Sequence, residues 1–91
     1  MLDIEFSKQF KKDIALAKKR GLDISLLDNV LMTLRREEQL EPKFRDHPLK
    51  GNYKGYRECH VQPDWLLVYT VKSDRVTLLA YRTGTHSDLR F

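Results

Sequence analysis

Three histidines, an aspartate and an arginine in the C-terminal half of this sequence could carry acid–base chemistry. They are His47, His60, Asp64, Arg82 and His86. Histidine gives or takes a proton near neutral pH, because its ordinary pKa is about 6.5. An arginine guanidinium can hold the negative charge that develops on a phosphate. Together these side chains supply a base, an acid and a cation, which metal-free cleavage of an RNA phosphodiester requires.

Three predicted strands position these residues. The segments rich in β-branched and aromatic side chains are residues 56–61, 66–71 and 76–81. In an antiparallel meander, the end of the first strand, the start of the second and the end of the third lie along one edge. His60, Trp65 and Arg82 occupy those places. We therefore expect them at one edge of the sheet, with Asp64 in the turn and His86 just beyond.

The N-terminal half predicts one strand and two helices. Residues 2–6 alternate apolar and acidic side chains, which is the period of a half-buried strand. Ser7 stands where a helix N-cap is expected, and apolar residues recur at helical spacing until Gly21, a natural C-terminal stop. A second helix begins at Asp23 or Ser25 and fades in a charged run. We expect the two helices to form a hairpin.

A long irregular connection, residues 39–55, separates the helices from the meander and is broken by prolines and glycines. Basic and aromatic residues interleave along it. Basic side chains track phosphates and aromatic rings stack on unpaired bases. Lys50, Lys54 and Arg57 are the cations that we expect to bind RNA here. The structural alternative is a surface loop whose rings fold back onto the core.

Composition favours one small domain over residues 1–91. The 17 Lys plus Arg against 13 Asp plus Glu give a net charge of +4, which suits nucleic acid, an acidic protein or an anionic surface. The single cysteine, Cys59, cannot close an intrachain disulfide and is expected in the core. No apolar run approaches the ~20 residues of a membrane span, and no signal peptide is apparent. We expect a soluble cytoplasmic protein.

Each candidate also has a purely structural interpretation. His47 precedes a proline in a loop, and the ring of His60 could hydrogen-bond to the backbone. Arg82 could pair with a nearby carboxylate, and Trp65 could anchor the core. A metal site is not expected, because no two histidines have ligand spacing and Cys59 faces away from His60. We also expect no cofactor, since phosphate-binding and dinucleotide motifs are absent.

Three motifs carry a resemblance to a known family. They are residues 46–51 (DHPLKG), 55–65 (GYRECHVQPDW) and 82–86 (RTGTH). The chain resembles the RelE/ParE superfamily of toxins from type II toxin-antitoxin modules, and within it the YafQ branch, over essentially its whole length. The resemblance implies an α+β fold in which the N-terminal strand and the three-stranded antiparallel meander complete a four-stranded sheet around the helical hairpin.

The resemblance also implies an activity, because members of this branch are mRNA interferases that cut mRNA in the ribosomal A site. The functional positions fall on His47, His60, Asp64, Trp65, Arg82, His86 and Phe91. His86 is then the candidate acid, His47 or His60 with Asp64 the base, and Arg82 the phosphate clamp. Trp65 and Phe91 would stack on or orient a nucleotide.

The resemblance further implies a cognate acidic antitoxin that holds the toxin inactive and represses its own operon, so that operator DNA is reached only through the antitoxin. Two other functions stay open. One is a ribosome-independent ribonuclease that cuts free RNA. The other is a non-enzymatic inhibitor of DNA gyrase like ParE, although such a toxin has no need of converging histidines.

Overall fold

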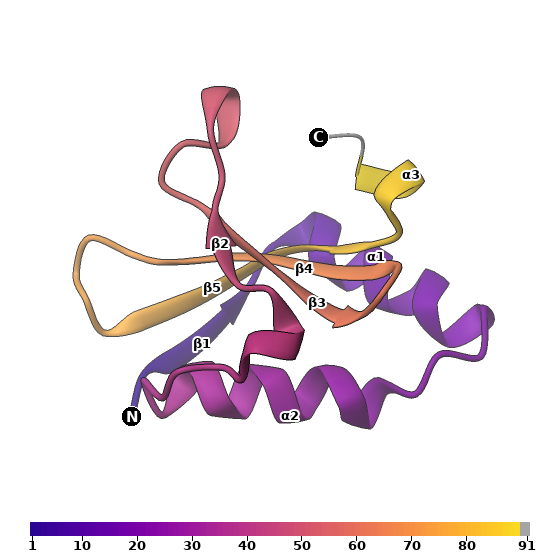
Figure 1. Ribbon diagram of the computed structural model, residues 1–91, viewed down its shortest axis with the longest axis horizontal. Coiled ribbons are helices and arrows are strands. Elements are labelled where there is room, and N and C mark those ends of the chain that lie inside the picture. Colours follow the sequence, from indigo (N-terminus) through magenta and orange to yellow (C-terminus); the bar gives the residue numbers. More distant parts are fainter. Residues whose placement is uncertain (90–91) are drawn as a thin grey trace.

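Five strands form one mixed sheet in the order β1-β5-β4-β3-β2 in the computed structural model, which describes residues 1–89 (Figure 1). The strands are β1 (Asp3–Phe6), β2 (His47–Pro48), β3 (Arg57–Gln62), β4 (Trp65–Val71) and β5 (Thr77–Gly84). The predicted α+β class and meander are confirmed. The predicted number of four strands is wrong, because the long connection contributes β2, which pairs antiparallel with β3. The N-terminal β1 pairs parallel with β5.

The helices follow the predicted capping signals. They are α1 (Lys8–Lys19), α2 (Ile24–Arg35) and the short α3 (His86–Leu89), with single 3-10 turns η1 (Pro42–Phe44) and η2 (Gly51–Tyr53). The Ser7 hydroxyl accepts a hydrogen bond from the Phe10 N–H and donates one to the Tyr81 carbonyl, which ties the start of α1 to β5. Gly21 ends α1 at a φ of +76°, and Asp23 caps α2.

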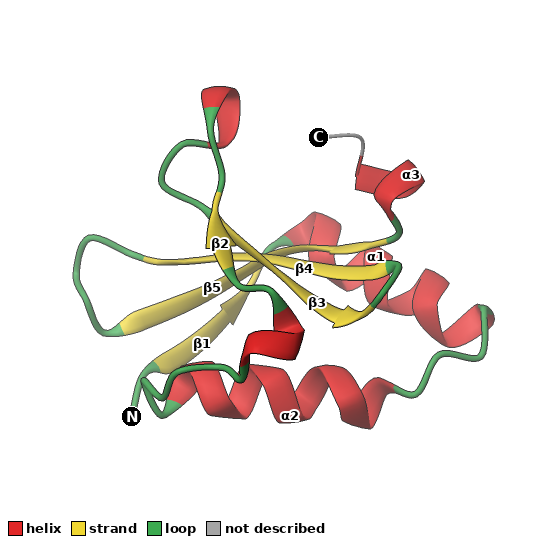
Figure 2. Cartoon of the chain, viewed as in Figure 1, coloured by secondary structure: helices red, strands yellow, loops and turns green. Residues whose placement is uncertain are grey.

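The two long helices cover one face of the sheet (Figure 2). Phe10 and Ala17 of α1 and Leu27, Val30 and Leu31 of α2 pack with buried strand residues in one core cluster. None of the helices within residues 1–89 combines the length and the apolar run that crossing a bilayer requires. On the other face, the segment carrying η2 and the C-terminal α3 rise from the sheet, away from α2 (Figure 1). This second face, called the open face below, carries the candidate site.

Strand register decides which side chains share the open face. His47, Glu58, Val68 and Arg82 are successive register partners across β2, β3, β4 and β5. Register partners point to the same face, so these four form one row. A bulge in β5 sets Arg82 in this row: Tyr69 pairs with Ala80, but Val68 pairs with Arg82, one residue further on. Without the bulge, alternation from buried Ala80 would turn Arg82 toward the helices.

Trp65 belongs to the core. Its side chain is 2% exposed, and its indole N–H donates to the Thr83 hydroxyl at 2.9 Å. The Thr83 hydroxyl in turn donates to the Leu66 carbonyl at 2.6 Å. The prediction that Trp65 stacks on a nucleotide is therefore wrong, because a buried ring offers no face to a base. Its structural interpretation as a core anchor is confirmed.

We expect Thr83→Val to lower the free energy of unfolding by about 1–3 kcal/mol, because valine fills the same volume but leaves the buried indole N–H of Trp65 without an acceptor. Urea unfolding of the purified variant measures this loss. Thr83→Ser is the matched control, since it keeps the hydroxyl and removes only a methyl group worth about 0.8 kcal/mol. A valine variant more stable than the serine variant would contradict the argument.

Candidate functional site

His86 is held in place by Asp64. The Asp64 carboxylate accepts the backbone N–H of His86 at 2.9 Å and lies 2.6 Å from its ring Nδ1. The backbone and side-chain hydrogen bonds from His86 hold the pKa of the Asp64 carboxyl below its ordinary value, so Asp64 is ionised at neutral pH. This contact is fully present above the ordinary carboxyl pKa and is lost as pH falls through the lowered one. Asp64 therefore orients His86. The prediction that Asp64 pairs with His47 or His60 to form the base is wrong.

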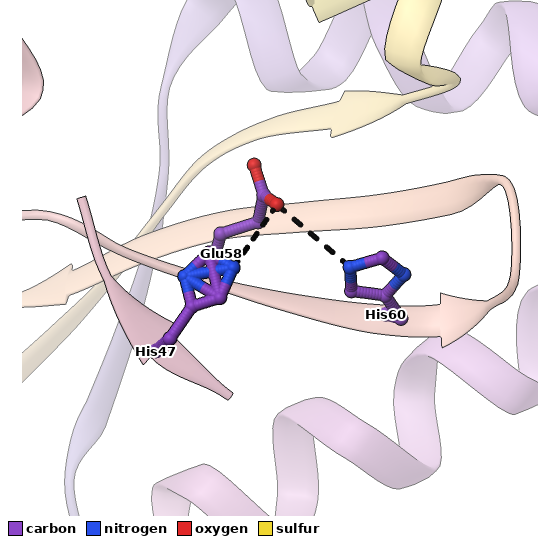
Figure 3. Close-up of side chains that lie close together, drawn as sticks. All are labelled: His47, Glu58 and His60. Carbon is purple, nitrogen blue, oxygen red and sulfur yellow. Dashed lines mark ion pairs between the residues drawn. The ribbon is translucent and has the colours of Figure 1, made fainter. Parts of the chain in front are cut away.

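Glu58, not the predicted Asp64, is the carboxylate beside His47 and His60. Its Oε1 lies 3.5 Å from Nε2 of His47 and 3.9 Å from Nε2 of His60 (Figure 3). Glu58 is 7% exposed. Strand alternation brings Glu58 and His60 to one face, and the pairing of β2 with β3 adds His47. Glu58 was not among the residues predicted from the sequence, although its position two residues before His60 was a signal for it.

The two groups meet on the open face. The rings of His60 and His86 have their centroids 5.5 Å apart. Glu58 with His47 and His60 therefore lies on one side of this gap, and His86 with Asp64 lies on the other. Three imidazole rings and two carboxylates are thus gathered on one face of the sheet.

Arg82 is paired with Asp13 of α1, which was not predicted as its partner. Its Nε donates to Asp13 Oδ2 at 2.8 Å and its Nη2 to Asp13 Oδ1 at 3.3 Å. The same carboxylate accepts the Thr83 N–H at 3.1 Å, so it caps the edge of β5 beyond the end of β1. The Arg82 side chain keeps a quarter of its surface exposed. Arg82 stands two residues before the end of β5, so its predicted place at the strand end is wrong.

The remaining residues predicted to bind substrate lie in different parts of the structure. Lys50 and Lys54 are exposed on either side of η2. Arg57 is not beside the histidines, because it alternates with Glu58 and points to the opposite face, where it donates to Asp46 at 3.3 Å. Its predicted contact with substrate has no support from this position. Phe91 lies outside the described residues.

The Arg57–Asp46 pair has a positioning role. Asp46 also accepts the Tyr69 hydroxyl at 2.6 Å, and it immediately precedes His47. The side chains of β3 and β4 therefore fix the chain at the start of β2.

Cys59, between Glu58 and His60, is fully buried on this inner face, and burial raises the pKa of its thiol to about 12.

Three side chains on the open face form a candidate metal-binding group, although the spacing of the histidines along the chain predicted no metal site. One ligand atom each from His47, Glu58 and His60 lies within 4.8 Å of the other two. Histidine spacing along the chain did not indicate this group, because the pairing of β2 with β3 assembles it from two segments. The donor set has two nitrogens and one carboxylate oxygen, which is a set that zinc sites use.

The backbone at Gly84 sets the position of α3. A Cβ added there would lie 2.9 Å from Asp88 Oδ2 and 3.0 Å from Asp88 Cβ. Asp88 cannot easily yield, because Arg20 donates to it at 2.6 Å and 3.1 Å and the Thr85 N–H at 3.0 Å. The hydrogen bonds from Arg20 and Thr85 hold the pKa of the Asp88 carboxyl well below its ordinary value.

We expect Gly84→Ala to push α3 away from β4 and to lower the free energy of unfolding by about 1–3 kcal/mol through overpacking. The ring nitrogen resonances of His86 should shift, because His86 begins α3. In an Asp88→Ala background the same substitution should cost less, since the carboxylate is gone and only the 3.0 Å contact with the Cβ of residue 88 remains. Equal costs in the two backgrounds, measured by urea unfolding, would contradict the steric explanation.

The fold and this histidine-rich face define a class of protein. Residues 2–91 match the model of a family described as the bacterial toxin of type II toxin-antitoxin systems, YafQ. The chain belongs to this family, and the resemblance found in its motifs is confirmed.

Individual relatives agree over nearly full length. The mRNA interferase toxin YafQ of Escherichia coli strain K12 is 47% identical over 89 residues, covering 96% of this chain and 94% of that relative. The crystal structure of a metal-bound toxin from Helicobacter pylori is 50% identical, covers 98% of this chain and 99% of that chain, and has a TM-score of 0.91. The toxin chain in the structure of the E. coli DinJ-YafQ complex is 42% identical, with a TM-score of 0.87 and 98% of both chains covered.

Proposed function

We propose that this toxin is an endoribonuclease that cleaves mRNA in the ribosomal A site and thereby inhibits translation. The observation that carries the proposal is the juxtaposition of two groups on the open face: His86 held by Asp64, and Glu58 between His47 and His60. The E. coli relative, an mRNA interferase, supports the choice of substrate. The protein acts in the cytoplasm, where translating ribosomes are found.

The chemistry is metal-independent acid–base catalysis. Glu58, with His47 and His60 beside it, takes the proton of the 2′-hydroxyl as its oxygen attacks the adjacent phosphorus. The bond from phosphorus to the 5′ oxygen breaks, and His86 gives that leaving oxygen a proton. The products are a 2′,3′-cyclic phosphate and a 5′-hydroxyl end, so atoms and protons balance. Asp64 orients the His86 ring.

Arg82 stabilises the charge that develops on the phosphorane. Asp13 fixes its guanidinium through Nε and Nη2, which leaves Nη1, as far as residues 1–89 are concerned, for a phosphate oxygen. A pre-positioned cation costs little reorganisation during the reaction. Lys50 and Lys54, exposed beside η2, contact the RNA backbone, and the lysines of α1 contact ribosomal RNA.

The partner that restrains the toxin is an acidic antitoxin. The E. coli relative is found in a complex with DinJ, and the net charge of +4 on this chain favours an acidic partner. Operator DNA is reached only through that antitoxin. No membrane association is part of the proposal.

Primer-extension mapping of mRNA 5′ ends tests the proposal. The purified chain, or its His86→Ala variant, is added to translating ribosomes and separately to naked RNA. Codon-phased cuts that occur only on ribosomes and are lost in the variant are expected. Equal cutting of naked RNA would indicate a ribosome-independent ribonuclease, and no cutting with either substrate would favour a gyrase-binding toxin.

A further inference from the structure

A cleft of about 560 Å³ opens where η1, α2 and the end of β3 meet (Figure 1). His60 forms part of its wall and also belongs to the cluster with Glu58 on the open face. The cleft therefore adjoins the groups that are proposed to react. Its volume lies within the range of ligand-binding sites in proteins.

The lining of the cleft combines apolar walls with two side-chain amides. Leu26 of α2 and Phe44 of η1 are half-buried and pack against the core. Asn29 and Gln62 line the same cleft and are exposed. An amide offers a hydrogen-bond donor beside an acceptor, and such pairs match the edges of unpaired bases. The lining therefore suits a flat, partly apolar group with a hydrogen-bonding edge, which is what a nucleobase is.

The charge of the cleft is positive. Lys43 and Arg45 are exposed on its rim, and none of the lining residues is acidic. Within residues 1–89 the Arg45 guanidinium has no carboxylate partner, whereas Arg57 and Arg82 are each held by an aspartate. A free guanidinium beside an apolar wall suits a phosphate next to a base.

The backbone at Arg45 is held on both sides. Its N–H donates to the Pro42 carbonyl at 3.0 Å, and the carboxylate of the next residue, Asp46, accepts from Arg57 and Tyr69. Binding of a phosphate therefore has to order only the side chain of Arg45, which keeps the entropic cost of the contact low.

The reacting groups decide which nucleotide reaches the cleft. In the proposed chemistry, Glu58 with His60 takes the proton of the 2′-hydroxyl, which belongs to the nucleotide on the 5′ side of the scissile phosphate. His86 serves the leaving oxygen on the 3′ side. The cleft is lined by His60 but not by His86 or Asp64. It therefore lies next to the ribose that carries the attacking oxygen.

We propose that this cleft binds the nucleotide on the 5′ side of the scissile phosphate. The base lies against Leu26 and Phe44, where Asn29 and Gln62 hydrogen-bond to its edge, and its own 5′-phosphate is held by Arg45. The cleft is thus the place where the toxin reads this base. The direction of the strand rests on the proposed ribonuclease function, whereas occupation of the cleft by RNA does not require cleavage.

Photo-crosslinking tests occupation without cleavage. Ribosomes are programmed with mRNAs whose A-site codon lacks 2′-hydroxyls and carries 4-thiouracil or 6-thioguanine at one of its positions. The nucleotide on the 5′ side of the mapped cut should crosslink to residues 26–29, 43–45 or 60–62, and the nucleotide on the 3′ side should not. Crosslinks of the 5′ nucleotide to other residues, or none, would overturn the proposal. Crosslinks to the cleft from a chain that never cuts RNA would refute the ribonuclease function and uphold RNA binding there.

Cleavage rates test the reading of the base. Four mRNAs differ only in the base on the 5′ side of the cut, and the wild type should cut them at rates that differ by about 5-fold or more. The double variant Asn29→Ala, Gln62→Ala should cut all four at similar rates. The same preference in the double variant, or equal rates for the wild type, would contradict base reading in the cleft while leaving the ribonuclease function intact.

Arg45→Asn tests the phosphate contact. Asparagine tolerates the left-handed backbone at this position, where φ is +52°. The variant should lower kcat/KM on programmed ribosomes by about 10-fold, mainly through KM, because one charge-assisted contact is lost. Arg75→Asn is the matched control, since Arg75 is also exposed, has a φ of +61° and lies in the turn before β5. Thermal melts establish that both variants fold, and equal losses in the two would overturn the role of Arg45.

Discussion

The His86→Ala variant is expected to cleave mRNA about 10²- to 10⁴-fold more slowly than the wild type, because it lacks the acid that protonates the leaving 5′ oxygen. The loss should fall on the chemical step. The ring of His86 is the group that Asp64 orients, and it lies 5.5 Å from the ring of His60. Single-turnover cleavage on programmed ribosomes measures the rate directly.

The folded structure of the protein should be unchanged in the His86→Ala variant. Alanine at position 86 keeps the backbone N–H that donates to Asp64 at 2.9 Å, so the start of α3 stays anchored. Ribosome binding and the unfolding midpoint should therefore match the wild type. Lys72→Ala is the control for a general surface change, since Lys72 pairs with Glu5 at a distance from the site. A cleavage rate close to wild type would remove His86 from the role of acid.

Glu58→Gln is expected to reduce the rate by a comparable factor of about 10²–10⁴, because an amide cannot accept the 2′-hydroxyl proton. The substitution keeps the shape of the side chain and removes only its charge. His47 and His60 remain in place, so the variant separates the carboxylate from the rings beside it.

Comparison with His60→Gln assigns the base. If Glu58 accepts the proton, Glu58→Gln should be the slower of the two variants, with His60 supporting the carboxylate. If His60→Gln is slower and Glu58→Gln keeps substantial activity, the histidine is the base and Glu58 positions it. Glu5→Gln, an exposed carboxylate on β1, controls for the loss of one negative charge.

Local signals in the sequence predicted most of the elements. Ser7 and Gly21 bound α1 because capping depends on residues within one turn of the helix end. The three long strands were also predicted, since their composition is strongly β. β2 was missed, because two residues, one of them a proline, have no period and pair only because β3 lies beside them.

Most of the residues of the candidate site were predicted from the sequence, but their hydrogen-bond and ion-pair partners were not. His47, His60 and His86 do converge, but their carboxylate partners were misassigned. Neither Glu58 nor Asp13 was considered, because a strand pairing and an ion pair between residues 13 and 82 depend on tertiary structure. The bulge that turns Arg82 to the open face is a register shift, which local composition does not encode.

The reactivity of Cys59 reports on local or global unfolding of the protein. Its thiol is fully buried within β3, next to both Glu58 and His60, and reacts slowly with alkylating reagents for as long as the strand stays paired. Labelling can therefore proceed only through chains in which β3 has separated from the helices or the whole domain has unfolded. The labelling rate of this single natural cysteine thus measures how often the strand that carries the site comes apart.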